Sequence, residues 1–272
     1  MCKAYDKIFC ASRDCKANLL PSQMIDKILA VWGTPRTRST AFLWMMKQRG
    51  DFHTFHEPFG KSFYLSEDRR SNRAADQPAR ADLNYTAILD MLESHKGKDG
   101  RSVFIKDLTY HFEGVYSREF LSHFHNVFLI RDPAQTLPSL YSLLPDFTPS
   151  ELGYDTQYHM YEAVSAATNT SPLVIDADDL ATNPRAVVYA FCKEVGIPFI
   201  EESLQWDNIP PSTSLTWWIG GDWHHDNLKK STGFQTKRFK EYPEVSEIPK
   251  LAMAYEQSLP YFEKLFAKRL IV

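Results

Sequence analysis

The chain has 272 residues, of which 43% are hydrophobic and 24% charged, and its formal net charge is −3. This is an ordinary globular composition, which excludes a disordered or membrane-embedded chain. The charge argues against a general nucleic-acid-binding protein, which would carry a basic excess, so an anionic small ligand would have to be bound by local Arg and Lys.

The N-terminal region and the cysteines indicate a cytoplasmic protein. Charged residues recur near the start of the chain, where we expect an N-terminal extension over 1–24, so no apolar run is long enough for a signal peptide or a membrane anchor. The four cysteines, at positions 2, 10, 15 and 192, are too few for a disulfide scaffold and lack the paired spacing of a zinc site. We therefore expect reduced thiols, no metal site and no membrane partner.

Apolar runs of strand length alternate with helical patterns, which is typical of a parallel sheet with helices on both faces. We predict strands at 28–32, 52–55, 103–106, 127–130 and 173–176, and helices at 40–48, 85–95, 114–123, 133–144 and 150–168. Asn183 caps a further helix, which begins at Pro184 and ends at Val195 before Gly196. The sequence therefore predicts an α/β fold of three layers, in a single domain over 1–272.

Two segments interrupt this alternation. Residues 60–82 are polar and weakly periodic, and residues 213–239 are dense in Trp, Gly, His and Lys. Long loops in a compact domain are often lids or binding loops. We therefore expect a lid-like loop at 60–82 and a ligand-binding loop at 213–239.

A polar turn from Gly33 to Thr40 follows the first strand and leads into the first helix. Such a turn presents free backbone N–H groups and the positive end of a helix dipole to an anion, which favours a nucleotide phosphate. Arg38 and Ser39 replace the Gly and Lys of the Walker pattern, so the turn departs from an ATPase or kinase loop. The alternative is a β-turn with surface arginines.

Arg131 and Ser139 form a second motif. Arg131 follows the strand at 127–130, at the edge where open α/β sheets bind ligands, and Ser139 lies on the next helix and faces back toward it. We expect the pair to hold a second phosphate. The alternative is a salt-bridged strand end.

The two motifs together resemble the family of sulfotransferases that depend on 3′-phosphoadenosine 5′-phosphosulfate (PAPS). The first is similar to the family's 5′-phosphosulfate loop and the second to its 3′-phosphate motif, and the resemblance covers residues 28–199, including Asn183-Pro184 and 191–198. It implies a P-loop-like nucleotide-binding fold with PAPS as co-substrate. The residues implied to bind PAPS are Pro35, Arg36, Thr37, Arg38, Ser39, Thr40, Arg131 and Ser139.

A segment near the C-terminus resembles the family's loop that closes over the nucleotide. It contains Gly220–Trp223 and then Lys229, Lys230 and Gly233. The resemblance implies that the basic residues meet the 3′-phosphate and that the aromatic residues meet the adenine or the acceptor. The alternative is a solvated lysine pair beside a structural Trp.

Sulfuryl transfer needs a cation near the leaving oxygen and a base for the acceptor's proton. Arg36 stands where the family usually has a loop Lys, and its planar guanidinium is able to bridge the phosphate and the leaving oxygen. Lys106, at the end of the third strand, is a second cation. We expect both to stabilise developing negative charge.

His56 and Glu57, which follow the second strand, are the candidate bases. Many cytosolic members of the family place a base His two residues after the strand Lys, but that position is Leu108 here. Glu57 followed by Pro resembles other, mostly bacterial, branches, which favours Glu57. Asp107 and His111 are further candidates.

Both candidate bases also have a structural interpretation. His56 would be a partly buried ring bonded to backbone, and Glu57 would form an ion pair with Arg36 or Lys106. The sequence predicts a sulfotransferase that moves a sulfuryl group from PAPS to a hydroxyl or amine of a small-molecule acceptor, with no nucleic-acid partner. The alternatives are a P-loop kinase that uses ATP and magnesium, and a non-catalytic nucleotide-binding module.

Overall fold

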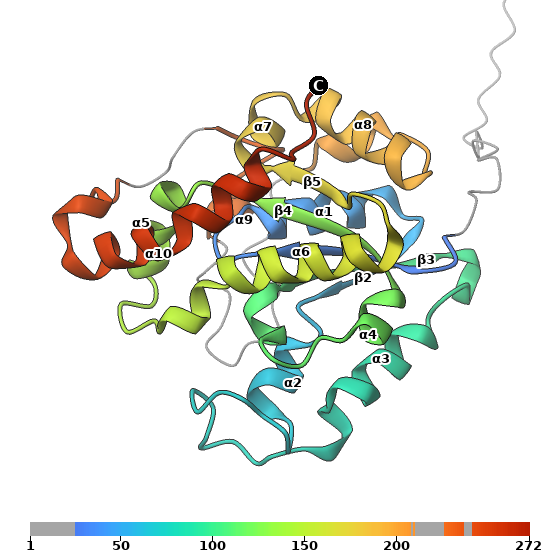
Figure 1. Cartoon of the computed structure of the whole chain (residues 1–272). Coiled ribbons are helices and arrows are strands. Elements are labelled where there is room, and N and C mark those ends of the chain that lie inside the picture. The colour runs from blue at the N-terminus through green and yellow to red at the C-terminus, as the bar shows by residue number, and fades with distance from the viewer. Residues whose placement is uncertain (1–24, 208, 210–225, 237–240) are drawn as a thin grey trace, which may run out of the picture.

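The computed structural model describes residues 25–207, 209, 226–236 and 241–272. Its five described strands form one parallel sheet in the order β2-β3-β1-β4-β5 (Figure 1). They are β1 (Ile28–Gly33), β2 (Phe52–His56), β3 (Ser102–Leu108), β4 (Phe124–Ile130) and β5 (Leu173–Asp176). The predicted α/β class is confirmed, and each predicted strand lies within an observed one.

Helices cover both faces of this sheet (Figure 1). The described α-helices are α1 (Ser39–Arg49), α2 (Gly60–Leu65), α3 (Tyr85–Glu93), α4 (Arg118–Ser122), α5 (Pro133–Tyr141), α6 (Tyr154–Thr168), α7 (Ala177–Thr182), α8 (Pro184–Val195), α9 (Asp226–Lys229) and α10 (Pro249–Phe266). Short 3₁₀ helices are η1 (Ala81–Leu83), η2 (Lys98–Gly100), η3 (Thr109–Phe112), η4 (Pro149–Leu152), η5 (Glu201–Leu204) and η7 (Val245–Glu247).

The central strand β1 explains the three layers. All its side chains are buried: Ile28, Ala30 and Trp32 pack into one hydrophobic cluster, and Leu29 and Val31 into another. The first cluster includes residues of α3, α5, α6 and α10, and the second includes residues of α1, α7 and α8. An unbroken apolar strand is what burial on both faces requires.

Two predicted helices are shorter than expected because glycines interrupt them. The helix predicted at 114–123 is reduced to α4, since Gly114 has a φ of 69° and the Ser117 side chain caps the helix three residues later. The helix predicted at 150–168 begins at Tyr154, because Gly153, with a φ of 71°, separates it from η4. The helix predicted at 133–144 ends at Tyr141.

The structure also adds helices. Helix α7, for which the sequence gave no prediction, forms directly after β5 because the Asp176 carboxylate accepts hydrogen bonds from the N–H groups of Asp178 and Asp179. The segment predicted as a loop at 60–82 begins with α2, and α10 was not predicted. The cap at Asn183 and the end of α8 at Val195, just before Gly196, are confirmed, and Gly196 has left-handed backbone.

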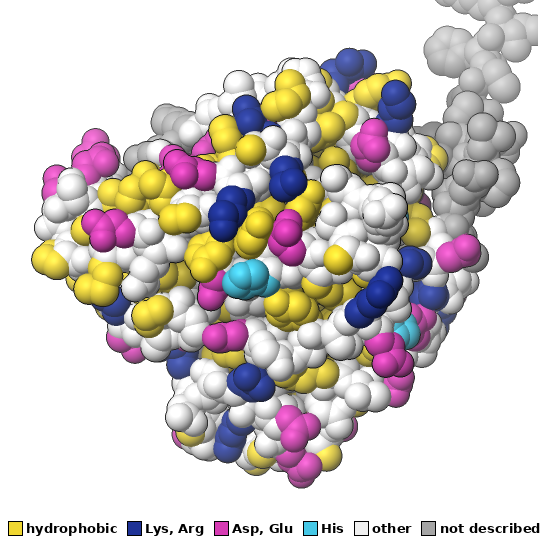
Figure 2. Space-filling view, viewed as in Figure 1, with side chains coloured by type: hydrophobic (Ala, Val, Ile, Leu, Met, Phe, Trp, Pro, Cys, Tyr) yellow, Lys and Arg dark blue, Asp and Glu magenta, His cyan; other side chains and the backbone are white. Residues whose placement is uncertain are grey.

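On the face shown in Figure 2, basic and acidic side chains are interspersed among apolar ones. Of the helices in the described ranges, none has both the length and the apolar character needed to cross a membrane. Within the same ranges, no group of three or more His, Cys, Asp and Glu side chains is placed to hold a metal ion.

Candidate functional site

The turn between β1 and α1 is compact and strained. The Thr37 hydroxyl donates to the Thr34 carbonyl oxygen at 2.8 Å, and a Cβ on Gly33 would lie 2.8 Å from that hydroxyl, so a side chain at position 33 would displace Thr37 and disturb the turn. Arg36 and Arg38 hold left-handed backbone, with φ of 67° and 60°, which side chains rarely adopt outside functional sites. The turn opens onto the first N–H groups of α1, a helix of 11 residues, where an anion binds well.

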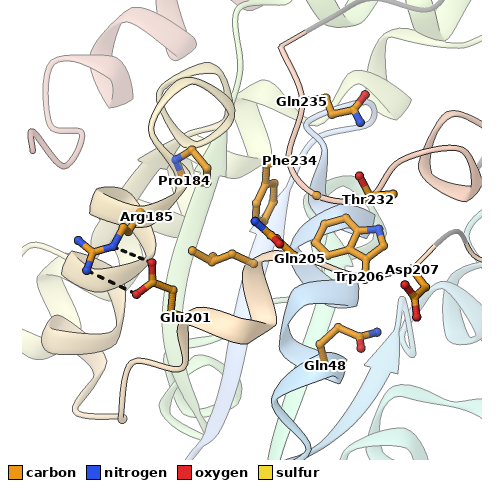
Figure 3. Close-up of a pocket in the computed structure, with 12 residues that line it drawn as sticks. Gln48, Pro184, Arg185, Glu201, Gln205, Trp206, Asp207, Thr232, Phe234 and Gln235 are labelled. Atoms are coloured by element: carbon orange, nitrogen blue, oxygen red, sulfur yellow. Dashed lines mark hydrogen bonds and ion pairs between the residues drawn. The ribbon is translucent and has the colours of Figure 1, made fainter.

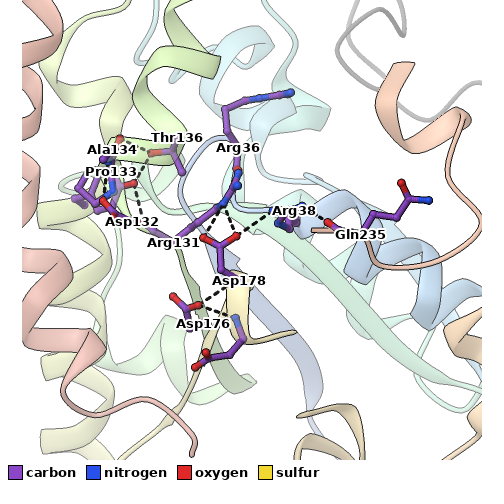
Figure 4. A network of polar contacts seen from close by, with 12 residues as sticks. Arg36, Arg38, Arg131, Asp132, Pro133, Ala134, Thr136, Asp176, Asp178 and Gln235 are labelled. Carbon is purple, nitrogen blue, oxygen red and sulfur yellow. Dashed lines mark hydrogen bonds and ion pairs between the residues drawn. The ribbon is translucent and has the colours of Figure 1, made fainter. Parts of the chain in front are cut away.

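The structure brings the two sequence motifs into contact (Figure 4). The Arg36 Nε donates to the Ser139 Oγ at 3.0 Å, and an Arg131 Nη donates to the Arg36 carbonyl oxygen at 3.1 Å. Arg131 is only 9% exposed, and burial lowers its pKa from the usual value. The turn after β1 and the end of β4 therefore form one basic site, although the residues that bond each other are 95 or more positions apart in the sequence.

Asp178, at the start of α7, organises this site. Its carboxylate accepts from Arg131 Nε at 3.2 Å and from Arg38 Nη2 at 3.0 Å (Figure 4). Asp178 was not identified as a site residue from the sequence. The run of aspartates at the end of β5 could have pointed to it, because it follows a strand at the edge of the sheet that binds ligands. The guanidinium groups of Arg38 and Arg131 meet at this carboxylate, and the Arg36 guanidinium contacts Ser139 instead, so the site holds three guanidinium groups, which suits a ligand with more than one negative charge.

Lys106 and Glu57 form the second half of the site. The Lys106 ammonium donates to the Glu57 carboxylate, and the Glu57 N–H donates to the Lys106 carbonyl oxygen at 2.6 Å. Lys106 is 2% exposed, and Glu57 has left-handed backbone with a φ of 46°. Glu57 is therefore an ion-paired carboxylate, and of the two partners that the sequence allowed, the structure shows Lys106.

The charges around Glu57 keep it ionised. Burial alone would raise its pKa, but Lys106, His56 and His111 outweigh burial and hold the pKa well below its ordinary value. The nearest approach of His56 is its Nε2, 3.6 Å from a Glu57 carboxylate oxygen. Glu57 is consequently a carboxylate at neutral pH, the form that accepts a proton.

Sheet register places the two halves together. β1 pairs with β3 so that Val31 lies beside Lys106 and Gly33 beside Leu108. The strained turn, Lys106 and the residues after β2 therefore share the carboxyl edge of the sheet, the edge where open α/β sheets bind ligands.

The C-terminal segment reaches the site through Gln235, whose backbone oxygen accepts from Arg38. Gly233 pairs with Gln205 in an isolated antiparallel bridge, and a Cβ there would lie 3.1 Å from the Leu204 carbonyl oxygen. Lys229 ends α9 and is half-buried, and Lys230 is exposed. Residues 210–225 and 237–240, with Gly220–Trp223, lie outside the described residues.

A cavity of about 880 Å³ lies beside this segment (Figure 3). Trp206 and Phe234 stand edge to face in its wall, with ring centroids 5.7 Å apart. Gln235 lines the cavity and also bonds Arg38, so the cavity adjoins the basic site. Its remaining walls include Pro184 and Thr232.

The rest of segment 60–82 is held to η4 by an ion-pair network. The Arg73 guanidinium donates to both oxygens of Glu151, one at 2.7 Å, and to Asp146 at 2.9 Å. Ser66 and Arg80 form a parallel bridge that closes the segment. The lid-like role of 60–82 stays a prediction.

Glu151→Gln is expected to lower the free energy of unfolding by about 1–3 kcal/mol at neutral pH, because it breaks charge-assisted bonds to Arg73. Burial raises the pKa of Glu151, but Arg73 and Thr148 outweigh it and lower the pKa. Its stabilisation is therefore complete above the ordinary carboxyl pKa and is lost as the pH falls through the lower, folded-state pKa. Urea unfolding from neutral pH down to about pH 3 should show the variant converging on the wild type.

The matched control is Glu201→Gln, which breaks the exposed ion pair with Arg185. It should change the free energy of unfolding by less than about 1 kcal/mol at any pH. A deficit in Glu151→Gln that persists unchanged at low pH would contradict the assignment to the ion pair.

Residues 26–268 match a family model described as "Sulfotransferase domain". Two Arabidopsis thaliana proteins, branched-chain-amino-acid aminotransferase-like proteins 2 and 1, are 28% and 26% identical over 88% of this chain. The chain spans 41% of the length of each of them.

Two solved structures also resemble the chain. They are the sulfotransferase domain of the Synechococcus PCC 7002 olefin synthase, 15% identical with a TM-score of 0.47, and mouse sulfotransferase SULT7A1 complexed with PAP, 10% identical with a TM-score of 0.46. The first match covers 86% of this chain and 94% of that domain, and the second covers 88% and 85%.

Proposed function

The chain belongs to the sulfotransferase domain family, and from this membership we propose that it moves a sulfuryl group from PAPS to a hydroxyl or amine of a small-molecule acceptor. Sulfuryl transfer with PAPS as co-substrate is the activity of the family. The hydroxyl or amine acceptor is our proposal for this chain. The observation that carries the proposal is the joining of the strained turn to Arg131 and Ser139 in one basic site.

A donor with phosphate groups at two ends accounts for this arrangement. The turn and the N-terminus of α1 supply N–H donors for the 5′-phosphosulfate. Arg131 and Ser139 supply donors for the 3′-phosphate, with Lys229 and Lys230 as further basic residues of the same role. Arg36 contacts both motifs and links the two ends. The cavity that adjoins the basic site has the rings of Trp206 and Phe234 in its otherwise mostly polar wall, and a purine ring would pack against these two rings.

The reaction is an in-line displacement at sulfur. The acceptor oxygen forms a bond to sulfur while the bond from sulfur to the bridging oxygen breaks, and the electron pair leaves with 3′-phosphoadenosine 5′-phosphate (PAP). Arg36 and Lys106 stabilise the charge that develops on the leaving oxygen. Glu57 takes the acceptor's proton, and His56 stands beside it as the second candidate base.

The test is calorimetric binding of PAP, with and without EDTA, followed by incubation with PAPS or with ATP and magnesium. We expect PAP to bind equally well in EDTA, because no step in this site needs a metal ion. Phosphoryl transfer from ATP would instead establish a kinase. Tight PAP binding without turnover of PAPS on a broad panel of hydroxyl and amine acceptors would identify a nucleotide-binding module.

A further inference from the structure

The Glu57 turn (Glu57-Pro58-Phe59), which follows β2, is held to the end of β3 by both of its N–H groups. Pro58 has no N–H, so Glu57 and Phe59 carry the two backbone donors of the turn. The Glu57 N–H donates to the Lys106 carbonyl oxygen at 2.6 Å, and the Phe59 N–H donates to a carboxylate oxygen of Asp107 at 2.8 Å. Two consecutive residues of β3 therefore fix the backbone on either side of Pro58.

The Asp107 carboxylate is a buried acceptor, and both of its oxygens are in use. The oxygen that does not bond Phe59 accepts from the Leu108 N–H at 2.8 Å and lies 2.6 Å from Nδ1 of His111. Because a carboxylate only accepts, Nδ1 carries a hydrogen and donates it. Asp107 has no exposed surface, which argues against its use as the base for the acceptor's proton.

The backbone of Glu57 needs such restraint. Its φ is 46°, a left-handed conformation that is unfavourable for a residue other than glycine and persists only where the surroundings impose it. The Glu57 carbonyl oxygen accepts from the Gly60 N–H at 3.1 Å, which closes the turn before α2. The fully buried ring of Phe59 packs edge-on against Phe112 and Phe120, so the chain leaves the turn at a fixed point.

The two residues of β3 reach the Glu57 turn from opposite faces of the sheet. Phe104 belongs to the hydrophobic cluster on the α1 face, and Ile105 belongs to the cluster on the α3 face. Because side chains alternate along a strand, Lys106 follows Phe104 and Asp107 follows Ile105. The Lys106 ammonium pairs with the Glu57 carboxylate on one face, while Asp107 holds the backbone from the other.

We propose that Asp107 is a positioning residue for sulfuryl transfer, which holds the Glu57 turn so that the Glu57 carboxylate stays at Lys106, in place to take the acceptor's proton. The proposal rests on the proposed function, in which Glu57 is the base. His111 acts one step further away, because its Nδ1–H fixes the Asp107 carboxylate. Neither Asp107 nor His111 exchanges a proton with the acceptor.

The first arm of the test follows the Glu57 carboxyl group by ¹³C NMR in the full chain, with Glu57→Gln used to assign its signal. In the wild type the carboxyl should stay ionised from pH 8 down to about 4, because Lys106, His56 and His111 hold its pKa low. In Asp107→Ala the turn is released and the carboxylate moves away from Lys106. Its pKa should then rise to about 4.3 or above, so that it titrates within this range.

Loss of the Asp107 charge by itself would act in the opposite direction, since a neighbouring negative charge raises the pKa of a carboxyl group. Asp107→Asn separates the two effects. Its amide oxygen still accepts from the Phe59 N–H, and its amide N–H can donate to Nδ1 of His111 in the other tautomer, so Glu57 should stay ionised as in the wild type. A Glu57 carboxyl that stays ionised to about pH 4 in Asp107→Ala, or that titrates in Asp107→Asn, would overturn the proposal.

The second arm measures transfer of label from ³⁵S-labelled PAPS to 2-naphthol. Asp107→Ala should lower kcat about 100-fold, with the KM for PAPS and the calorimetric affinity for PAP within about twofold of the wild type. Combined with Glu57→Gln, it should lower kcat no further than Glu57→Gln alone, because both changes act through the same carboxylate. Asp107→Ser, whose side chain ends one bond earlier, replaces Asp107→Ala in both arms if that variant does not fold.

The matched control is Asn84→Ala. It also removes a side-chain oxygen that accepts from a backbone N–H, that of Ala87 at the start of α3. It should cost stability in a similar way and leave kcat within about twofold. A loss of kcat in Asn84→Ala as large as that in Asp107→Ala would overturn the positioning role, because reduced stability would then account for both.

The two arms separate failure of this inference from failure of the proposed function. Full kcat in Asp107→Ala, or a further loss when it is combined with Glu57→Gln, would overturn the role of Asp107 while leaving sulfuryl transfer standing. A wild-type chain that moves no label to 2-naphthol would bear on the acceptor. The NMR arm, which needs neither PAPS nor an acceptor, would then decide the inference alone.

Discussion

Glu57→Gln is expected to lower the rate of sulfuryl transfer by about 10²–10⁴-fold while PAP binds as tightly as to the wild type. Glutamine keeps an oxygen that accepts from Lys106, so the buried ammonium retains a partner. What is lost is the ability to take a proton. Initial rates with PAPS, together with calorimetric binding of PAP, measure the two properties separately.

The control for Glu57→Gln is Glu93→Gln. Glu93 is the last residue of the distant helix α3, and its carboxylate pairs with Lys96. The transfer rate of this variant should match that of the wild type. A Glu57→Gln chain with full activity would remove Glu57 from the chemistry, and a chain that no longer binds PAP would make Glu57 a structural residue of the site.

Arg131→Ala should weaken PAP binding by about 100-fold, equivalent to about 2.7 kcal/mol. The substitution removes a positive charge that is 9% exposed and therefore poorly screened by solvent. It also removes the donor to the Arg36 carbonyl oxygen. Asp178, which pairs with both Arg38 and Arg131 in the wild type, would then pair with Arg38 only. Calorimetric titration with PAP at fixed ionic strength measures the loss.

Two variants show whether this loss comes from the guanidinium group. Arg131→Lys keeps the charge but not the fork that reaches both Asp178 and the turn, so its affinity should lie between those of the wild type and Arg131→Ala. Arg269→Ala breaks a comparable ion pair with Asp179, one residue further along α7, and should leave PAP affinity unchanged. Equal affinities for Arg131→Ala and wild type would argue against a phosphate at this position.

The strands and most helices follow from local pattern, because β1 is apolar throughout and α8 carries its own cap and stop signals. Helices α4 and α6 were misjudged where Gly114 and Gly153 adopt left-handed backbone inside a helical pattern. Helical periodicity carries no information on backbone conformation at such positions.

The site divides in the same way. Arg36, Arg131 and Ser139 were named from the sequence because their motifs are local, and the structure joins them. Asp178 was missed because its partnership with Arg38 spans 140 residues and depends on how α7 packs beside the turn. The sequence offered either Arg36 or Lys106 as the partner of Glu57. Sheet register decides between them, because β2 and β3 pair so that His56 lies beside Lys106.

The left-handed backbone at Arg36, Arg38 and Glu57 also bears on how the chain would respond to directed evolution. Glycine adopts such conformations without steric strain, so substitution by glycine would relax the backbone at these positions while deleting a guanidinium or carboxylate group. A library screened for heat resistance alone is therefore expected to accumulate glycine at the turn but not at Glu57, because the buried Lys106 ammonium would lose its partner there. Such clones would gain melting temperature and lose affinity for the nucleotide, so screening has to select for binding at every round.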